Sequence, residues 1–352
     1  MKNSIICLFS ALLLAGATAQ AGNDQKKGQV GATQLQINPW ARSSGMAGAN
    51  TARIRGVEAV HQNIGGLAFV KGTEINFATT KWLTGTDINI NAFGLGQKLG
   101  ENGGVLGLSM MSIDFGNFKQ TTEMAPDQDV NFTASVVNLG LSYSKAFSNS
   151  IYGGITVRVI SESLPNASAT GVAFDGGVQY VTSVGKGELD ENNLHIGVSL
   201  RNVGPEMNFS GDGLSYRGMV RNGTYDQALE QRSESFELPA LLNIGVAYDL
   251  NMDEESRLTF AGNFVSNTAT QDQFQIGAEY AFMEKFMARA GFDYQEDTFS
   301  DDPSNVHTGL TAGATVEVPF GAEKNRSFGL DYSFRATRTF SGTHSVGIKI
   351  GL

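Results

Sequence analysis

Residues 327–335, with the sequence SFGLDYSFR, alternate large apolar side chains with small or polar ones. Successive side chains of a β-strand point to opposite faces, so this stretch predicts a strand with one apolar face and one polar face. Residues 242–248 and 274–280 show the same alternation. A helix would instead repeat its apolar positions every three or four residues. The pattern therefore indicates an all-β fold.

About fourteen such segments follow one another, each roughly 9 to 14 residues long. They begin near Thr73, Asp87, Gly104, Asn131, Ile151, Ala169, Leu194, Pro239, Ser256, Gln273, Phe286, Val306, Ser327 and Thr339. Strands of soluble sandwiches and propellers average nearer five or six residues, whereas tilted membrane-barrel strands need ~9 to 11 to cross the hydrocarbon. The lengths favour an antiparallel transmembrane β-barrel of about 14 strands.

The connections also sort by length, as in outer-membrane barrels with short periplasmic turns and long external loops. One alternate set consists mostly of tight turns, near residues 100, 148, 253, 284 and 321. The other set contains two long stretches, residues 117–130 and 205–238. An even strand count returns the C-terminus to the side of the turns, where residues 345–352 would close the barrel and remove its free edge.

In such a barrel the apolar faces meet lipid and the polar faces line the lumen. The inward set carries both signs of charge and comprises Arg158, Asp175, Gln179, His195, Arg201, Glu279, Arg289, Asp293, Glu317, Asp331 and Arg335. We expect these mixed charges to pair across the interior rather than to select ions. A lumen wider than that of an eight-stranded barrel has to be filled by something.

The first 21 residues have the features of a secretory signal peptide. Lys2 precedes an apolar run over residues 5–17, and small residues allow cleavage after Ala19 or Ala21. We therefore expect a signal peptide at residues 1–21, a periplasmic N-terminal segment with a hatch at 22–72, and a barrel at 73–352. The expected location is the outer membrane of a Gram-negative cell, reached by Sec export.

Composition narrows the possible partners. Cys7, the only cysteine, lies in the expected signal peptide, so the mature chain has no disulfide. The net charge of −10 argues against nucleic acid, whose binding needs clustered lysine and arginine. Outer-membrane lipid is the partner that the strands imply.

Residues 38–69 do not follow the strand pattern. They are rich in glycine and alanine, which allow the backbone to pack closely inside a curved wall. Arg42, Arg53 and Arg55 are placed to meet lumenal carboxylates. We expect this segment to enter the barrel from the periplasmic side and to fill the lumen.

Several stretches carry a family resemblance. They are NPWARSSGMAGA (38–49), QNIGGLA (62–68), TKWL (80–83), LRNVGPEM (200–207), GLDYSF (329–334) and THSVGIK (343–349). On these residues the chain resembles FadL-type barrels, in particular the PorV/PorQ family of the Bacteroidota. The family hatch usually carries Asn-Pro-Ala, whereas Ile64 and Gly65 follow Asn63 here, so the rigid turn of a proline is missing.

The resemblance implies a fourteen-stranded barrel with a hatch and a role in type IX protein secretion, in which the barrel engages secreted cargo or a large translocon. The hatch residues would be Asn38, Pro39, Gly45, Gly48, Arg53, Asn63, Gly65, Gly66 and Leu67. External-loop contacts to a partner would involve Pro205, Asp212, Tyr216, Arg217, Arg221 and Tyr225. The alternative is a FadL-like transporter of a hydrophobic small molecule such as a fatty acid, with Phe69, Phe77, Met110 and Met111 offering apolar surface. A purely structural role is a third hypothesis.

No enzymatic or cofactor motif stands out. Residues 94–100 miss the dinucleotide-binding spacing by one residue and precede no helix. The four histidines are isolated from one another, and neither a nucleophile elbow nor a metal-ligand spacing occurs. The sequence therefore predicts a non-enzymatic protein without a cofactor or a metal.

Overall fold

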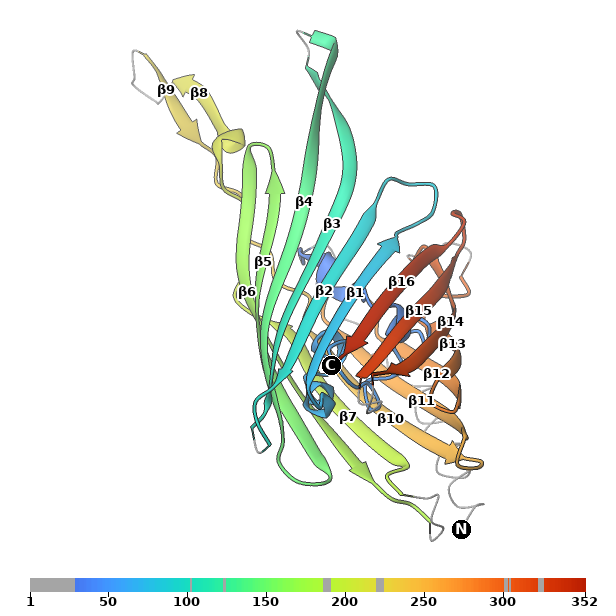
Figure 1. Ribbon diagram of the computed structural model, residues 1–352. Coiled ribbons are helices and arrows are strands. Elements are labelled where there is room, and N and C mark those ends of the chain that lie inside the picture. Colours follow the sequence, from blue (N-terminus) through green and yellow to red (C-terminus); the bar gives the residue numbers. More distant parts are fainter. Residues whose placement is uncertain are drawn as a thin grey trace.

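The computed structural model describes residues 29–101, 103–122, 125–185, 191–219, 225–300, 303, 305–321 and 326–352. Fourteen antiparallel strands form a closed barrel (Figure 1). They are β1 (Thr73–Lys81), β2 (Asn89–Lys98), β3 (Val105–Thr122), β4 (Ala125–Ala146), β5 (Ile151–Leu164), β6 (Ala167–Thr182), β7 (Leu194–Val203), β10 (Leu241–Asn251), β11 (Ser256–Asn267), β12 (Gln273–Phe282), β13 (Phe286–Tyr294), β14 (His307–Phe320), β15 (Arg326–Thr337) and β16 (Thr343–Gly351). The predicted fold class and strand number are confirmed.

Each barrel strand pairs with its neighbours in the chain, and β1 pairs with β16 to close the ring. In that closing ladder Ile75 lies opposite Ile350, and Lys81 lies opposite His344. The barrel wall therefore has no unpaired edge strand, which removes the template for aggregation that an open sheet would present.

The alternation of the sequence reappears as two faces of the wall. In β15, Leu330 is 47 % exposed on the outside, whereas Asp331 is 2 % exposed on the inside. The outer face carries large exposed apolar side chains on many strands, among them Ile155 and Leu141. Such a wide apolar surface needs a cover, and lipid is the cover that suits a barrel.

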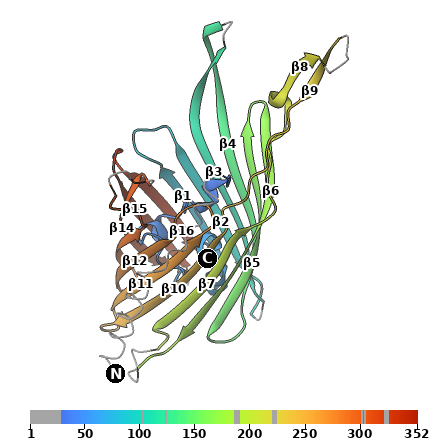
Figure 2. The same cartoon turned by 180° about the vertical axis from the view of Figure 1, so that it is seen from behind.

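Two hairpins project beyond the barrel at the same end (Figures 1 and 2). The expected loop at 117–130 is wrong, because β3 and β4 stay paired out to Thr122 and Ala125. Above the membrane the strands no longer need a lipid-facing side, so their alternation fades while the backbone ladder continues. The second hairpin, β8 (Ser215–Met219) with β9 (Asp226–Glu230), lies within the long connection between β7 and β10.

The N-terminal segment, residues 29–72, runs inside the barrel along its length. We call the end where β7 stops and β10 begins the loop end, and the end where β1 begins the turn end. The Gly31 amide donates to the Glu237 carbonyl oxygen at the loop end, and the Gly72 carbonyl accepts from Lys98 at the turn end. The direction expected from the sequence is therefore wrong for the described residues, which start at the loop end.

Short helical pieces make up this segment: η3 (Thr33–Gln36), α2 (Ala41–Ser44), α3 (Ala59–Gln62) and η4 (Ile64–Phe69). Its apolar side chains form the core, where Val57, Val60 and Leu67 pack with Val105 of β3. No helix among the described residues is long and apolar enough to span a membrane. The segment therefore depends on its contacts with the wall for its shape.

Candidate functional site

Arg42 of α2 holds the segment to one side of the wall. Its Nε donates to Asp331 Oδ1 at 3.1 Å and its Nη2 donates to Glu317 Oε2 at 3.0 Å. Asp331 is almost fully buried, and Lys349 lies 3.4 Å from Glu317. Buried charges are stable only when paired, so this contact fixes α2 against β14 and β15.

Arg53 makes a second contact farther around the barrel, at β10, four strands from β14. Its Nε donates to Asp249 Oδ2 at 2.8 Å, and His195 Nε2 lies 3.0 Å from the same oxygen. Arg257 continues the network to Glu279, whose other oxygen accepts from Arg289 at 2.5 Å. The predicted pairing of lumenal charges is present, and two arginines of the N-terminal segment belong to it.

Asn63 replaces the missing proline as the residue that shapes the turn before η4. Its Oδ1 accepts from the Gly65 amide at 3.1 Å, and its Nδ2 donates to the carbonyl oxygens of Thr51 and Val178. Gly66 follows, where an added Cβ would lie 2.2 Å from the Ile54 carbonyl oxygen. One amide side chain thus joins two parts of the segment to β6.

The other hatch candidates lie along the same segment. Asn38 accepts from the Trp40 amide and donates to Ser43, which shapes the chain ahead of α2. Gly45 lies against Gly313 of β14, and Gly48 has a φ of 77°, a conformation that favours glycine. Of the two remaining candidates, Pro39 lines a small gap beside β3. Leu67 belongs to the apolar core.

The stretch LRNVGPEM forms a bulge at the end of β7. Asn202 has a φ of 59°, its amide donates to Asp175 Oδ1 at 2.6 Å, and its side chain donates to the Pro239 carbonyl oxygen. Arg201 points inward and donates to the Leu35 carbonyl oxygen at 3.2 Å. This stretch therefore connects the wall, the long connection and the N-terminal segment.

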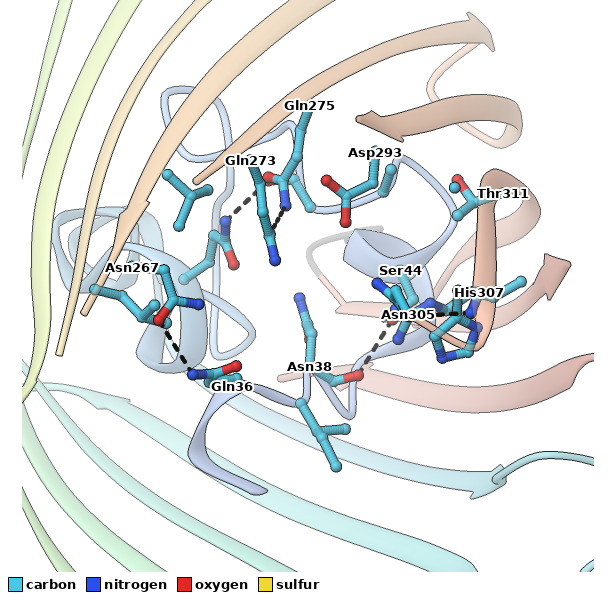
Figure 3. Close-up of a pocket in the computed structure, with 18 of the residues that line it drawn as sticks. Gln36, Asn38, Ser44, Asn267, Gln273, Gln275, Asp293, Asn305, His307 and Thr311 are labelled. Carbon is cyan, nitrogen blue, oxygen red and sulfur yellow. Dashed lines mark hydrogen bonds between the residues drawn. The ribbon is translucent and has the colours of Figure 1, made fainter. Parts of the chain in front are cut away.

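A cavity of about 300 Å³ lies at the loop end between the N-terminal segment and the wall (Figure 3). The segment supplies Gln36, Asn38 and Ser44, while β11 to β14 and their connections supply the facing side chains labelled in Figure 3: Asn267, Gln273, Gln275, Asp293, Asn305, His307 and Thr311. Some of these amides bond to one another, as Gln36 does to Asn267 and Gln275 to Gln273. The volume is at the lower limit for small-molecule pockets.

Three polar groups in this lining lack full partners within the described residues. Asp293 Oδ1 is buried without a hydrogen bond, and so are both ring nitrogens of His307, a residue only 8 % exposed. Arg335 lies beside Asp293 in the same lining, and its guanidinium is 5.4 Å from the Trp82 ring. Buried polar groups without partners are uncommon and call for a ligand or water.

Apolar surface borders the cavity on one side. Ile37 and Trp82 line the cavity and also pack against a cluster of inward side chains on β2 to β4, which includes Ile90 and Ile113. Of the four residues expected to offer apolar surface, Phe77 and Met110 are exposed on the outer face. Met111 is buried in the cluster beside the cavity, and Phe69 stacks on Tyr152 away from it.

The external-loop candidates lie around the β8–β9 hairpin. Tyr216 and Arg217 belong to β8, Tyr225 precedes β9, Asp212 starts the short turn η6 (Asp212–Leu214), and Pro205 follows β7. Tyr216 is 54 % and Tyr225 66 % exposed. Arg221 lies outside the described residues. None of the described candidates lines the cavity.

The sequence placed Arg201, Asp293 and Arg335 in the lumen and Asn38 in the hatch, and these residues line the cavity, but the wall amides around them were not singled out. Asn243, Asn267 and Gln275 occupy inward positions close to the loop ends of successive strands. An amide at equivalent inward positions of neighbouring strands is a pattern that period-2 analysis can detect. Among the described residues no group of three or more His, Cys, Asp or Glu side chains could hold a metal ion.

We expect the binding of the N-terminal segment to the wall to depend on pH through Glu58. The residue is 5 % exposed and its Oε2 has no hydrogen-bond partner in the described structure. Burial, and then the nearby Asp331 carboxylate, raise the pKa of Glu58 to about 7. The pKa of Glu58 is higher in the folded than in the unfolded state. The neutral carboxyl group therefore stabilises the bound segment fully below pH ~4.5, and this stabilisation is lost as the pH rises through about 7.

We therefore expect residues 41–62 to exchange amide hydrogen faster at pH 8 than at pH 5, after correction for intrinsic exchange rates. Glu58→Gln should flatten this dependence, since the amide stays neutral. Hydrogen exchange followed by mass spectrometry measures both. An unchanged pH dependence in Glu58→Gln would contradict the assignment.

Comparisons with known proteins show the fold. No protein-family model matches the chain, and no curated protein does. The toluene transporter TbuX of Ralstonia pickettii superimposes with a TM-score of 0.53 at 14 % identity, over 90 % of this chain and 98 % of that chain. The toluene transporter TodX of Pseudomonas putida gives a TM-score of 0.52 at 14 % identity, over 89 % and 97 %. The architecture is that of a FadL-like barrel.

Proposed function

We propose that this chain is an outer-membrane transporter that takes up a hydrophobic or amphipathic small molecule, with the N-terminal segment as its gate. The observation that carries the proposal is the cavity at the loop end, between that segment and the wall. The apolar outer face supports the membrane location. Proteins with the same fold are described as toluene transporters.

The bonds between the N-terminal segment and the wall explain why transport needs a gate. Arg42 and Arg53 bind wall carboxylates on two sides, and Asn63 bonds to β6. A molecule bound in the cavity cannot travel down the lumen while these contacts persist. These contacts are made by side chains, so α2 and the residues beside it can leave the wall without opening the strand ladders, while the apolar core around Val57 and Leu67 stays packed on β3.

Uptake by whole cells tests this proposal. A Gram-negative host without a FadL-type barrel would express the chain, and the entry of radiolabelled toluene, benzyl alcohol and a long-chain fatty acid would be followed. We expect faster entry of at least one compound than in host cells carrying an empty vector. Entry of every compound at the same rate as in the empty-vector cells would contradict the proposal.

A second candidate function is the secretion accessory suggested by the resemblance to the PorV/PorQ family. The observation that favours it is the projecting β8–β9 hairpin, on which Tyr216 and Met219 are exposed. Together with Tyr225, they would form the contact surface for a partner protein.

This second function predicts an effect of removing the hairpin. Replacing residues 215–230 by a short glycine-serine linker should leave the barrel folded, because β8 and β9 pair only with each other in the described sheets. Secreted cargo or a large translocon should then no longer copurify from gently solubilised native membranes. Retained copurification would contradict the secretion role.

A further inference from the structure

The loop-end cavity is more polar than a hydrocarbon requires. Side-chain amides recur around it: Gln36, Asn38, Gln62, Asn243, Asn267, Gln273, Gln275 and Asn305. A plain hydrocarbon would displace water from these groups without replacing its hydrogen bonds. That substitution is costly for each group left without a partner.

The charges of the lining argue against an ionised ligand. Asp293 and Arg335 interact with each other in this lining. Arg335 is compensated by Asp293 and Arg201 by Asp175, so neither a carboxylate nor an ammonium ligand would find an uncompensated counter-charge, and each would also meet a like charge. Arg201 is already engaged with the Leu35 carbonyl oxygen and with His61. A neutral group avoids both repulsions.

The unpartnered atoms define what the neutral group must offer. Asp293 Oδ1 needs a donor, and the two ring nitrogens of His307 together need one acceptor and one donor. A hydroxyl group both donates and accepts, so one hydroxyl can donate to Asp293 Oδ1 and accept from the ring N–H of His307. Ile37 and Trp82 offer an apolar surface next to these atoms.

We propose that the loop-end cavity is a binding site for an uncharged amphipathic molecule whose hydroxyl group is held by Asp293 and His307 and whose apolar body lies against Ile37 and Trp82. This inference rests on the proposed transport function and specifies its substrate class. It separates hydroxylated compounds from the plain hydrocarbons and the carboxylates of the same size.

Three compounds with one ring provide the test: toluene, benzyl alcohol and benzoate. The Trp40→Phe protein retains Trp82 as its single tryptophan, so fluorescence titration of the detergent-solubilised barrel reports on the cavity. The Trp82→Phe protein, which retains Trp40, corrects for partitioning into the micelle. We expect benzyl alcohol to bind about tenfold more tightly than either other compound, as two extra hydrogen bonds would give.

Two variants identify the atoms. His307→Phe keeps a ring beside Trp82 and should reduce the preference for benzyl alcohol over toluene by about fivefold. Asn138→Leu is the matched control, because Asn138 is also inward, buried and unpartnered but lies outside this cavity. Its preference should not change. Heat-modifiable migration on a gel verifies that each barrel is folded.

The inference would be overturned if toluene or benzoate bound more tightly than benzyl alcohol. It would also be overturned if His307→Phe and Asn138→Leu lost the preference for benzyl alcohol equally. Cell uptake separates this failure from failure of the transport function. Barrel-dependent entry without any preference for benzyl alcohol in binding leaves transport standing and rejects the hydroxyl site. A binding preference without barrel-dependent entry of any of the three compounds keeps the site and rejects transport.

Discussion

A disulfide between residues 41 and 347 is expected to stop uptake. A Cβ placed on Gly347 of β16 would lie 3.6 Å from the Cβ of Ala41 in α2, within the range of about 3.5–4.5 Å found in disulfides. The oxidised Ala41→Cys/Gly347→Cys protein would hold α2 on the wall. Entry of labelled substrate should fall to the level of cells without the barrel, and a reductant should restore it.

A disulfide within the wall is the matched control. A Cβ on Gly140 of β4 would lie 3.8 Å from the Cβ of Ser109 in β3, opposite it in the ladder. Ser109→Cys/Gly140→Cys joins two strands and leaves the N-terminal segment free, so oxidation should not alter uptake. Undiminished uptake by the oxidised 41/347 pair would show that α2 need not leave the wall.

Replacing Arg42 by alanine is expected to release the N-terminal segment. The change leaves Asp331 without its charged partner and removes the bond to Glu317. Removing one member of a buried ion pair costs about 3–5 kcal/mol. If that cost falls on the binding of the segment to the wall, the population with the segment released rises by about two to nearly four orders of magnitude. Hydrogen exchange over residues 41–54 and conductance in planar bilayers would both increase.

Arg55→Ala controls for the loss of an arginine from the same segment. Arg55 lies 4.4 Å over the ring of Phe69 and makes no ion pair within the described part of the chain. Its removal should cost about 1 kcal/mol, far less than removal of Arg42. Arg42→Lys keeps the charge but cannot bond to both carboxylates in the same geometry, so we expect an intermediate effect. Equal exchange in Arg42→Ala and Arg55→Ala would contradict the role of Arg42.

The barrel could be predicted from the sequence because each strand carries its own information. A lipid-facing wall needs an apolar side chain at every second position, as in residues 327–335, and a length sufficient to cross the membrane. The projecting parts of β3 and β4 lack that constraint, so residues 117–130 resembled a loop. The β8–β9 hairpin was missed for the same reason, since its strands are short and polar.

The candidate site could be predicted only in part. Resemblance pointed to Asn63 and Arg53, but their partners, Val178 and Asp249, are distant in sequence and meet them only when the barrel closes. The cavity depends on the same closure, which brings Gln36 of the N-terminal segment to Asn267 of β11. Periodicity predicts which side chains face inward. It does not predict which of them leave a space.

The accessibility of a cysteine at position 41 tests the gate most directly. Ala41 is 1 % exposed and faces Gly347, which leaves room for a sulfur atom. Cells carrying Ala41→Cys would be treated with a membrane-impermeant thiol reagent, with and without toluene or benzyl alcohol. A moving gate predicts slow labelling at rest and faster labelling with substrate. Identical labelling rates under conditions of measured uptake would contradict it.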